Sequence, residues 1–234
     1  MARAVPPERF GKLIEAATKV FVERGYRQTQ MSEVADALGL AKGTLYGYVE
    51  SKESLFDAAV RFSDQVNVTA PERLPLPTPP LASTANYIRD RLASEASELR
   101  LVAALAHPPA KADRAREFES IVRDLYRRMS RNRRAIKLVD RCAPEHPELA
   151  AVWFQQGRWA QVELLAEYLR RRIASGYLRE VPSIPLAARM MLETITLWAV
   201  HMPWDPAPRA FGDHDVEDAV VDLVVHAYIK ESRR

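Results

Sequence analysis

Residues 29–56 constrain the fold most strongly, because they predict two short helices separated by a tight turn. Val34 and Leu38 have the spacing of one apolar helical face. Gly39 follows directly, and a glycine there permits the left-handed backbone that ends a helix. We therefore expect a helix that begins near Thr29, with the Thr29 hydroxyl as its N-cap, and a turn at Gly39.

A second short helix is expected after this turn. Ala41, Leu45 and Val49 recur every fourth residue and predict the edge that packs on the preceding helix. The outer face then carries small, hydrogen-bonding or aromatic side chains, namely Lys42, Gly43, Thr44, Tyr46 and Gly47. Such a set suits a helix that enters the major groove of DNA, which is about 12 Å wide.

At these residues the sequence resembles the DNA-binding domain of the tetracycline-repressor (TetR) family. The family pattern is matched from Ala35 to Gly39, by the run KGTLY at 42–46, by Tyr48 and by the run SKE at 51–53. The resemblance covers about residues 8–60. It implies an all-α fold, with an N-terminal three-helix helix-turn-helix domain and a larger C-terminal helical domain for ligand binding and dimerisation. It also implies a ligand-responsive transcriptional regulator, with a repressor favoured, that binds a palindromic or pseudo-palindromic operator as a homodimer.

The resemblance further implies which residues contact double-stranded DNA. They are Thr29, Lys42, Gly43, Thr44, Tyr46, Gly47, Tyr48 and Lys52. Contacts to phosphate are expected from Thr29, Tyr48 and Lys52, and binding should then weaken with salt. For Tyr46 and Tyr48 the alternative is a half-buried place in the core of the domain.

Two positions depart from the family pattern. Ala41 stands where a serine or threonine commonly caps the recognition helix, and loss of such a cap typically costs about 1 kcal/mol. Gly47 replaces a larger residue, which leaves base reading to Lys42, Thr44 and Tyr46 or to DNA shape. The operator sequence is therefore left open.

Composition agrees with a helical protein in a reducing cytoplasm. The chain has 234 residues, of which 47% are hydrophobic and 28% charged, and only eight are glycine. The single Cys142 excludes an internal disulfide. Prolines interrupt both the N-terminal segment and the longest uncharged run, so neither a signal peptide nor a membrane helix is expected. The net charge of +3 is only a weak indication of a polyanionic partner.

Five prolines in residues 70–82 exclude a helix there and predict a domain boundary or stiff connection. We expect a DNA-binding domain over 1–51, a connecting helix over 52–69, the Pro-rich connection over 70–82, and a regulatory and dimerisation domain over 83–234. The expected helices are 7–24 in the first domain and, in the last, 83–107, 113–142 with a break near 130–132, 147–175, 185–202 and 213–232.

The last two expected helices predict a subunit interface. Helix 185–202 is apolar around nearly its whole circumference, and Val221 and Val225 give helix 213–232 a second apolar face. One chain of this size offers one obvious core, so we expect a second copy to cover the surplus face. The resemblance implies the same four-helix dimer bundle, and a fully internal pair of helices is the alternative.

A site for a small-molecule effector is expected among the middle helices, and no cofactor is expected. The candidates are aromatic, methionine or polar side chains: Tyr87, Trp153, Gln156, Met190, Glu193, Trp198 and His201. Gln156 falls within an apolar stripe and Glu193 within the most apolar helix, so each would need a partner if buried. Ordinary core packing is the alternative for the aromatic residues. The identity of the effector is left open.

Catalysis finds little support in the sequence. The five histidines show no metal-binding spacing, and neither a Gly-rich phosphate loop nor a GxSxG motif occurs. Two other classes of function stay open as alternatives to a regulator. They are a helical-bundle enzyme and a DNA-independent interaction module that acts on a small apolar molecule.

Overall fold

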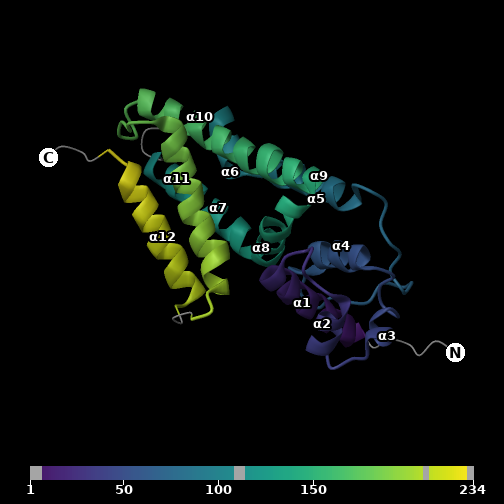
Figure 1. Ribbon diagram of the computed structural model, residues 1–234. Coiled ribbons are helices and arrows are strands. Elements are labelled where there is room, and N and C mark those ends of the chain that lie inside the picture. Colours follow the sequence, from purple (N-terminus) through teal and green to yellow (C-terminus); the bar gives the residue numbers. More distant parts are fainter. Residues whose placement is uncertain (1–6, 108–113, 208–210, 231–234) are drawn as a thin grey trace. The chain divides into compact units, whose positions relative to one another are not determined.

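The computed structural model describes residues 7–107, 114–207 and 211–230, which are helical apart from loops and two isolated β-bridges (Figure 1). The all-α prediction is thereby confirmed. The chain forms two compact units, one of Met1–Arg89 with Arg134–Trp153 and the other of Asp90–Arg133 with Phe154–Arg234. In the described ranges no helix is long and apolar enough to cross a membrane.

The first unit contains the predicted helix-turn-helix region and a segment from the middle of the chain. Its elements are α1 (Pro7–Arg24), α2 (Met31–Ala37), α3 (Lys42–Leu45), α4 (Lys52–Phe62), the beginning of α5 (Ser83–Ser97), α8 (Arg133–Cys142), η2 (Ala143–Glu145) and α9 (Pro147–Ala150). Its core is built on α1 and α4, where the Phe21 and Phe56 rings meet edge to face at 5.4 Å. The buried face of α1 includes Phe10, Leu13, Ile14, Ala17 and Phe21, as the sequence predicts.

Two helix ends in this unit differ from expectation. Thr29 is not the cap of α2, because its hydroxyl donates to the Gly25 carbonyl at 2.7 Å. Gln30 occupies the cap position, and its N–H donates to the Glu33 carboxylate at 2.9 Å. The connecting helix α4 ends at Phe62 rather than near residue 69, and the chain then turns through Asn67, whose φ is +57°.

The predicted division at residues 70–82 differs from the one that the chain makes. The first unit continues to Arg89 and takes in Arg134–Trp153, which the sequence assigns to the regulatory domain. Asp64, just beyond α4, explains one end of this attachment, since its carboxylate accepts the N–H groups of Arg134 and Ala135 at 2.9 and 3.0 Å. At the other end, the Cys142 thiol is buried and donates to the Phe21 carbonyl.

The second unit is a bundle of longer helices. It contains the remainder of α5, then α6 (Arg100–Ala106), α7 (Arg114–Arg131), the end of η3 (Ala151–Trp159), α10 (Ala160–Ala174), α11 (Ile184–Thr196), η4 (Leu197–His201), η5 (Met202–Trp204) and α12 (Asp213–Tyr228). In Figure 1, green α11 and yellow α12 lie beside each other and against α7. Arg123 of α7 donates to the Glu217 carboxylate of α12 at 2.7 Å and ties these two helices together.

The long helices predicted for this half of the chain are interrupted at several places. The expected helix 83–107 breaks between Ser97 and Arg100, and the expected break near 130–132 falls at Asn132. Helix 147–175 continues through the wider π-helical turns of η3 and ends at Gly176, whose φ is +70°. Of the last expected helix, the structure describes Asp213–Tyr228, while residues 231 and 232 lie outside the described residues.

Candidate nucleic-acid interface

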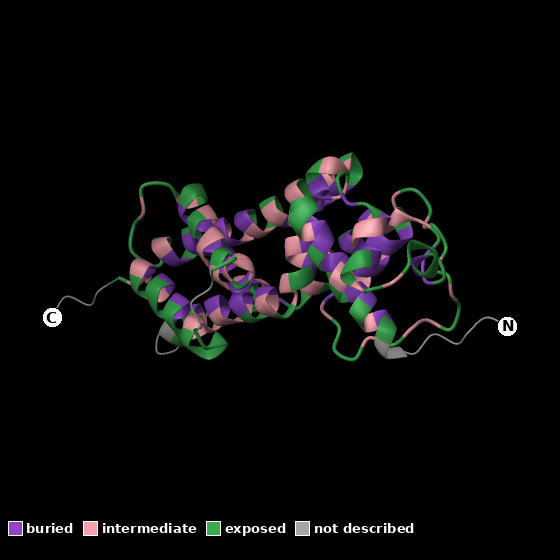
Figure 2. Cartoon of the chain, turned by 60° about the horizontal axis from the view of Figure 1, so that its bottom comes forward, coloured by how far each residue is buried: buried purple, intermediate pink, exposed green. Residues whose placement is uncertain are grey.

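The short helix α3 turns one edge inward and leaves the other at the surface. Leu45 and Val49 are fully buried, as their spacing predicts, whereas Ala41 is exposed and does not join that edge. The outer edge consists of exposed residues, namely Lys42, Gly43, Thr44, Tyr46 and Gly47. Figure 2 shows that helices of this protein carry both buried (purple) and exposed (green) residues. Tyr46 is 41% exposed, so the half-buried core placement does not apply to it. We call these five residues the α3 edge.

The turn before α3 depends on Gly39. Its φ is +63°, and a Cβ atom added there would meet nothing within 4 Å. The left-handed backbone, not lack of space, therefore requires glycine at this position. The Leu40 N–H returns to the Ala35 carbonyl at 2.9 Å, which closes the turn between α2 and α3.

The backbone at Gly47 lies close to the Thr44 carbonyl. Its N–H donates to the Thr44 carbonyl at 3.1 Å, and an added Cβ would lie 3.2 Å from that oxygen. A larger side chain would require the turn to shift by a few tenths of an ångström. The departure from the family pattern at this position thus has a local structural basis. Ala41 supplies no side-chain cap to α3, which confirms the other departure.

Tyr48 and Thr29 are buried, although the resemblance implies that both contact DNA. Tyr48 is 4% exposed, and the Leu76 N–H of the Pro-rich connection donates to its carbonyl at 2.8 Å. Thr29 is 2% exposed, and its hydroxyl is committed to Gly25. Its predicted side-chain contact to phosphate is inconsistent with this position.

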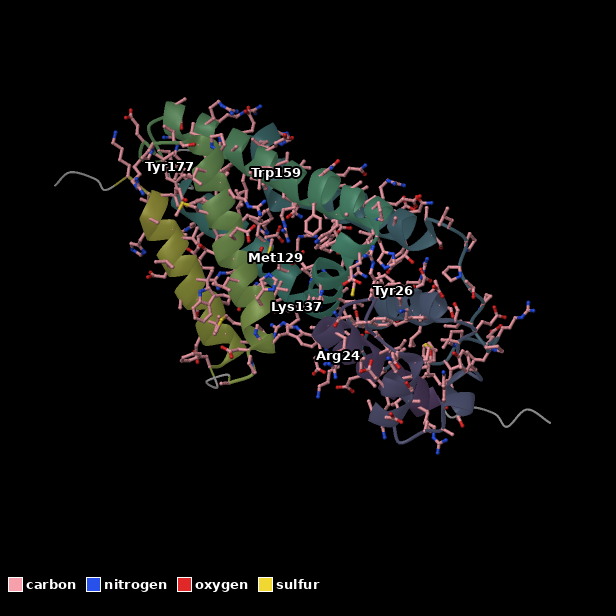
Figure 3. All side chains as sticks on the ribbon, viewed as in Figure 1. Arg24, Tyr26, Met129, Lys137, Trp159 and Tyr177 are labelled. Atoms are coloured by element: carbon pink, nitrogen blue, oxygen red, sulfur yellow. The ribbon has the colours of Figure 1, made fainter. Side chains whose placement is uncertain are left out.

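Lys52 is half-buried at the start of α4. Its ammonium group donates to the carbonyls of Tyr26, Arg27 and Thr29 at 3.0, 3.3 and 3.2 Å. All three acceptors belong to the turn between α1 and α2, where Figure 3 labels Tyr26 shortly after Arg24 at the end of α1. The sequence alone could not predict these partners, because every residue has a backbone carbonyl and only the fold determines which of them lie near Lys52.

The polar groups around this turn have shifted pKa values. The pKa of the Glu53 carboxyl lies below its usual value, because its own backbone N–H and then the Tyr26 hydroxyl donate to the carboxylate. Burial, together with the hydrogen bond to Glu53, raises the pKa of Tyr26. Both shifts favour a negative Glu53 hydrogen-bonded to a neutral tyrosine, and hence a fixed arrangement of the turn.

Three of the predicted ligand residues are less buried than their sequence patterns indicate. Gln156 is exposed, because the wide turns of η3 change the register in which it was placed in an apolar stripe. Met190 is 59% exposed. Glu193 needs no buried partner, since its side chain is 42% exposed and pairs with Arg189 at 2.6 Å.

The other four ligand candidates are half-buried. In the first unit, Tyr87 lies under the Arg61 guanidinium, 4.3 Å from its centre, and the Trp153 indole N–H donates to Asp140. In the second unit, His201 lies in η4, and Trp198 lines an apolar groove. The sequence predicted no part of this groove except Trp198.

Two hollows are formed by residues that the sequence analysis did not group. The groove at Trp198 has a volume of about 360 Å³ and is also lined by Phe211, Asp215, Val216, Ala219, Val220 and Leu223. A pocket of about 420 Å³ in the first unit lies among α4, residues 79–85 and residues 146–149. Among the residues that the structure describes, no group of three or more His, Cys, Asp or Glu side chains could hold a metal ion.

Family comparisons agree with both halves of this architecture. Residues 13–59 match the family described as bacterial regulatory proteins, tetR family, and residues 118–230 match the family described as AefR-like transcriptional repressor, C-terminal domain. These matches point to a transcription regulator and not to an enzyme.

Curated relatives match over the N-terminal part. The transcriptional activator FasR of Mycolicibacterium smegmatis is 44% identical over 54 residues, which are 23% of this chain and 25% of the relative. The transcriptional repressor KstR2 of Mycobacterium tuberculosis is 42% identical over 53 residues, which are 23% and 26%. The matched stretch therefore spans about a quarter of the length of these relatives.

Solved structures match over nearly the whole chain and support the fold. The ketosteroid transcriptional regulator KstR2 of Mycobacterium tuberculosis has a TM-score of 0.60 at 17% identity, with 98% of both chains covered. AibR, in complex with isovaleryl coenzyme A and operator DNA, has a TM-score of 0.52 at 17% identity, with 92% of this chain and 97% of AibR covered.

Proposed function

The chain belongs to the tetR family of bacterial regulatory proteins, and from this premise we propose that it is a ligand-responsive, DNA-binding repressor that acts as a homodimer in the cytoplasm. The observation that carries the proposal is the α3 edge. Its five residues are exposed, while Leu45 and Val49 anchor the helix in the core. A short helix anchored in this way enters the major groove without unfolding its domain.

The proposed DNA contacts follow from exposure. Lys42, Thr44 and Tyr46 supply an ammonium group, a hydroxyl and a ring at the surface, and the two glycines let the backbone approach DNA closely. Tyr48 has its ring in the core, so only its hydroxyl is proposed to reach a phosphate. In a dimer, two such helices would read half-sites spaced by about one turn of duplex or a multiple of it.

The proposed dimer face lies on α11, η4 and α12 and includes Phe211, which precedes α12. Its large exposed apolar side chains are Leu186, Met190, Leu197, Phe211 and Leu223. Of the two residues predicted for the surplus face, Val221 is 3% exposed and packs within its own unit, whereas Val225 is half-buried. An apolar patch of this kind indicates a protein partner, and a second copy would cover it.

The effector is proposed to act through differential affinity. A small molecule that binds better to a conformation with displaced α3 helices lowers operator affinity by the difference in binding free energy, commonly about 1–3 kcal/mol. AibR was crystallised with an acyl-coenzyme A thioester and operator DNA, so such thioesters are the first effectors to test on this chain. Trp198 and His201 are retained as proposed effector contacts, with Tyr87 and Trp153 as the corresponding candidates of the first unit.

A gel shift tests the proposal directly. The parent protein should retard a duplex taken from the promoter region beside its own gene, and Tyr46→Ala should weaken this shift at least tenfold, about 1.4 kcal/mol. Tyr48→Phe removes only the hydroxyl and should weaken binding while the fold is kept. The matched control is Tyr177→Phe in the second unit, which should bind like the parent.

Three outcomes would contradict the proposed function. They are a parent protein that binds no duplex even at low salt, a Tyr46→Ala variant as tight as the parent, and turnover of a small molecule by the purified protein. The first result would favour a DNA-independent interaction module, and the last would favour a helical-bundle enzyme.

A further inference from the structure

The Lys52 side chain is completely engaged inside the first unit. A lysine ammonium has three N–H donors. Lys52 directs hydrogen bonds to three backbone carbonyls, those of Tyr26, Arg27 and Thr29, all within 3.3 Å. Its nitrogen also lies 4.6 Å from the centre of the Tyr26 ring, where the negative face of the ring favours a cation. No donor is left for a DNA phosphate while these bonds persist.

The three carbonyls belong to the turn from which α2 starts. Thr29 is followed directly by Gln30, the cap residue of α2. The Thr29 N–H and hydroxyl both return to the Gly25 carbonyl, so the turn closes on itself as well as on Lys52. Because α2 packs on α3, the position of this turn sets the position of the α3 edge.

The opposite side of the same turn is held by the segment from the middle of the chain. The Arg141 guanidinium donates to the Arg24 carbonyl at 2.8 Å, and the Glu145 carboxylate accepts the Arg27 N–H. Residues 24–29 are thus hydrogen-bonded to α4, to α8 and to η2. A turn fixed from both sides has little freedom to let Lys52 leave for a phosphate.

We propose that Lys52 is a positioning residue for DNA binding, whose ammonium group fixes the α1–α2 turn and through α2 the α3 edge, and that it makes no phosphate contact. This inference rests on the proposed function. It differs from the phosphate contact that the resemblance implies for this position. Lys42 is the natural comparison, because it is exposed on α3 and its side chain forms no hydrogen bond or ion pair with another described residue.

Salt dependence distinguishes the two roles. Removing one phosphate contact reduces the slope of log K against log salt concentration by about 0.9. Lys42→Met and Lys52→Met are compared with the parent by fluorescence anisotropy on the promoter duplex of the gel shift. We expect Lys42→Met to reduce the slope, whereas Lys52→Met keeps the parent slope and lowers affinity between about 5- and 150-fold at every salt concentration.

Hydrogen exchange of the free protein supplies a readout without DNA. Lys52→Met should speed amide exchange at Thr29 and Gln30, and Lys42→Met should leave it unchanged. If Lys52→Met does not fold, Lys52→Gln takes its place, since its amide keeps two donors without the charge. The positioning role predicts a parent slope for Lys52→Gln as well, whereas a phosphate contact predicts the reduced slope.

The inference is overturned if a Lys52 variant reduces the salt slope as Lys42→Met does. It is also overturned if affinity, or exchange at Thr29 and Gln30, stays at the parent value in Lys52→Met. A parent protein that binds no duplex would instead remove the proposed function. The exchange experiment would still decide whether Lys52 holds the turn.

Discussion

Arg172 and Glu117 form an ion pair inside the second unit, with side chains only 7% and 11% exposed. The Arg172 Nε donates to one carboxylate oxygen at 2.8 Å and an Nη to the other at 3.2 Å, so the pair is bidentate. The Tyr168 hydroxyl donates to the same carboxylate at 2.9 Å, and Arg172 also reaches the Ala104 carbonyl at 2.9 Å. One ion pair therefore joins α7, α10 and the end of α6.

Breaking this pair from one side should be strongly destabilising. Arg172→Met leaves the Glu117 charge buried without its cation, which typically costs about 3–5 kcal/mol. The neighbouring Arg171→Met is a matched control, because Arg171 is 50% exposed and its loss should change stability by less than about 0.5 kcal/mol. Urea unfolding of the three proteins measures the difference. Equal midpoints for Arg172→Met and the parent would show that the pair contributes no net stability.

Local sequence patterns predict part of this architecture. Helical periodicity predicts α1 and the buried Leu45 and Val49, because both depend on spacing along a regular helix. The sequence pattern places Gln156 wrongly because the π-helical turns of η3 change the register, and Gly157 within this segment does not by itself predict such turns. The hydrogen bonds of the Lys52 ammonium group cannot be predicted in this way, because their acceptors are backbone carbonyls 23 to 26 residues away in the sequence.

Gly25 and Gly39 require glycine for different reasons. At Gly39 only the backbone conformation requires it, whereas at Gly25 lack of space adds to the backbone conformation. Gly25 and Gly39 both have positive φ, +83° and +63°. An added Cβ at Gly25 would lie 2.5 Å from a Glu145 carboxylate oxygen, whereas at Gly39 it meets nothing within 4 Å. Gly39→Ala should therefore cost only the strain of about 1–2 kcal/mol, and Gly25→Ala should cost more.

Chemical denaturation of the two glycine variants checks this order. The crowded neighbours of Gly25 are ends of side chains, so Gly25→Ala should also displace the Glu145 carboxylate from the Arg27 N–H. Faster exchange of that amide in Gly25→Ala, but not in Gly39→Ala, is the expected signature. A Gly39→Ala variant less stable than Gly25→Ala would show that the clash relaxes freely.

His146 should make the first unit sensitive to acid. Its ring stacks on Phe56 at 5.5 Å and meets Tyr26 edge to face at 4.1 Å, and its Nε2 atom is buried without a hydrogen-bond partner. Burial lowers the His146 pKa below its usual value. Arg27 and Lys52 act in the same direction, while the nearby Glu145 and Glu53 partly oppose it.

The sign of the pH effect follows from this lowered pKa. The unfolded chain takes up the His146 proton at a higher pH than the folded protein does. Stability is therefore complete above the unfolded pKa near 6.5 and is lost as pH falls towards the folded value. Unfolding free energies between about pH 5 and pH 7 should show a decline in the parent that His146→Phe reduces. An identical decline in both proteins would assign the effect to other groups.

Leu223 tests the proposed dimer face. It is 58% exposed on α12 and lines the apolar groove beside Trp198, so a carboxylate there would be placed against the second copy. Leu223→Glu should convert the dimer to monomers in sedimentation velocity at micromolar concentration, because an unpaired charge in an apolar interface lacks compensation.

His226→Glu is the matched control. His226 lies about one turn later on the same helix, outside the groove, and its side chain is 78% exposed beside Asp222. That variant should sediment like the parent. Monomers in the parent would contradict the proposed dimer, and dimers in Leu223→Glu would place the contact between copies elsewhere on the chain.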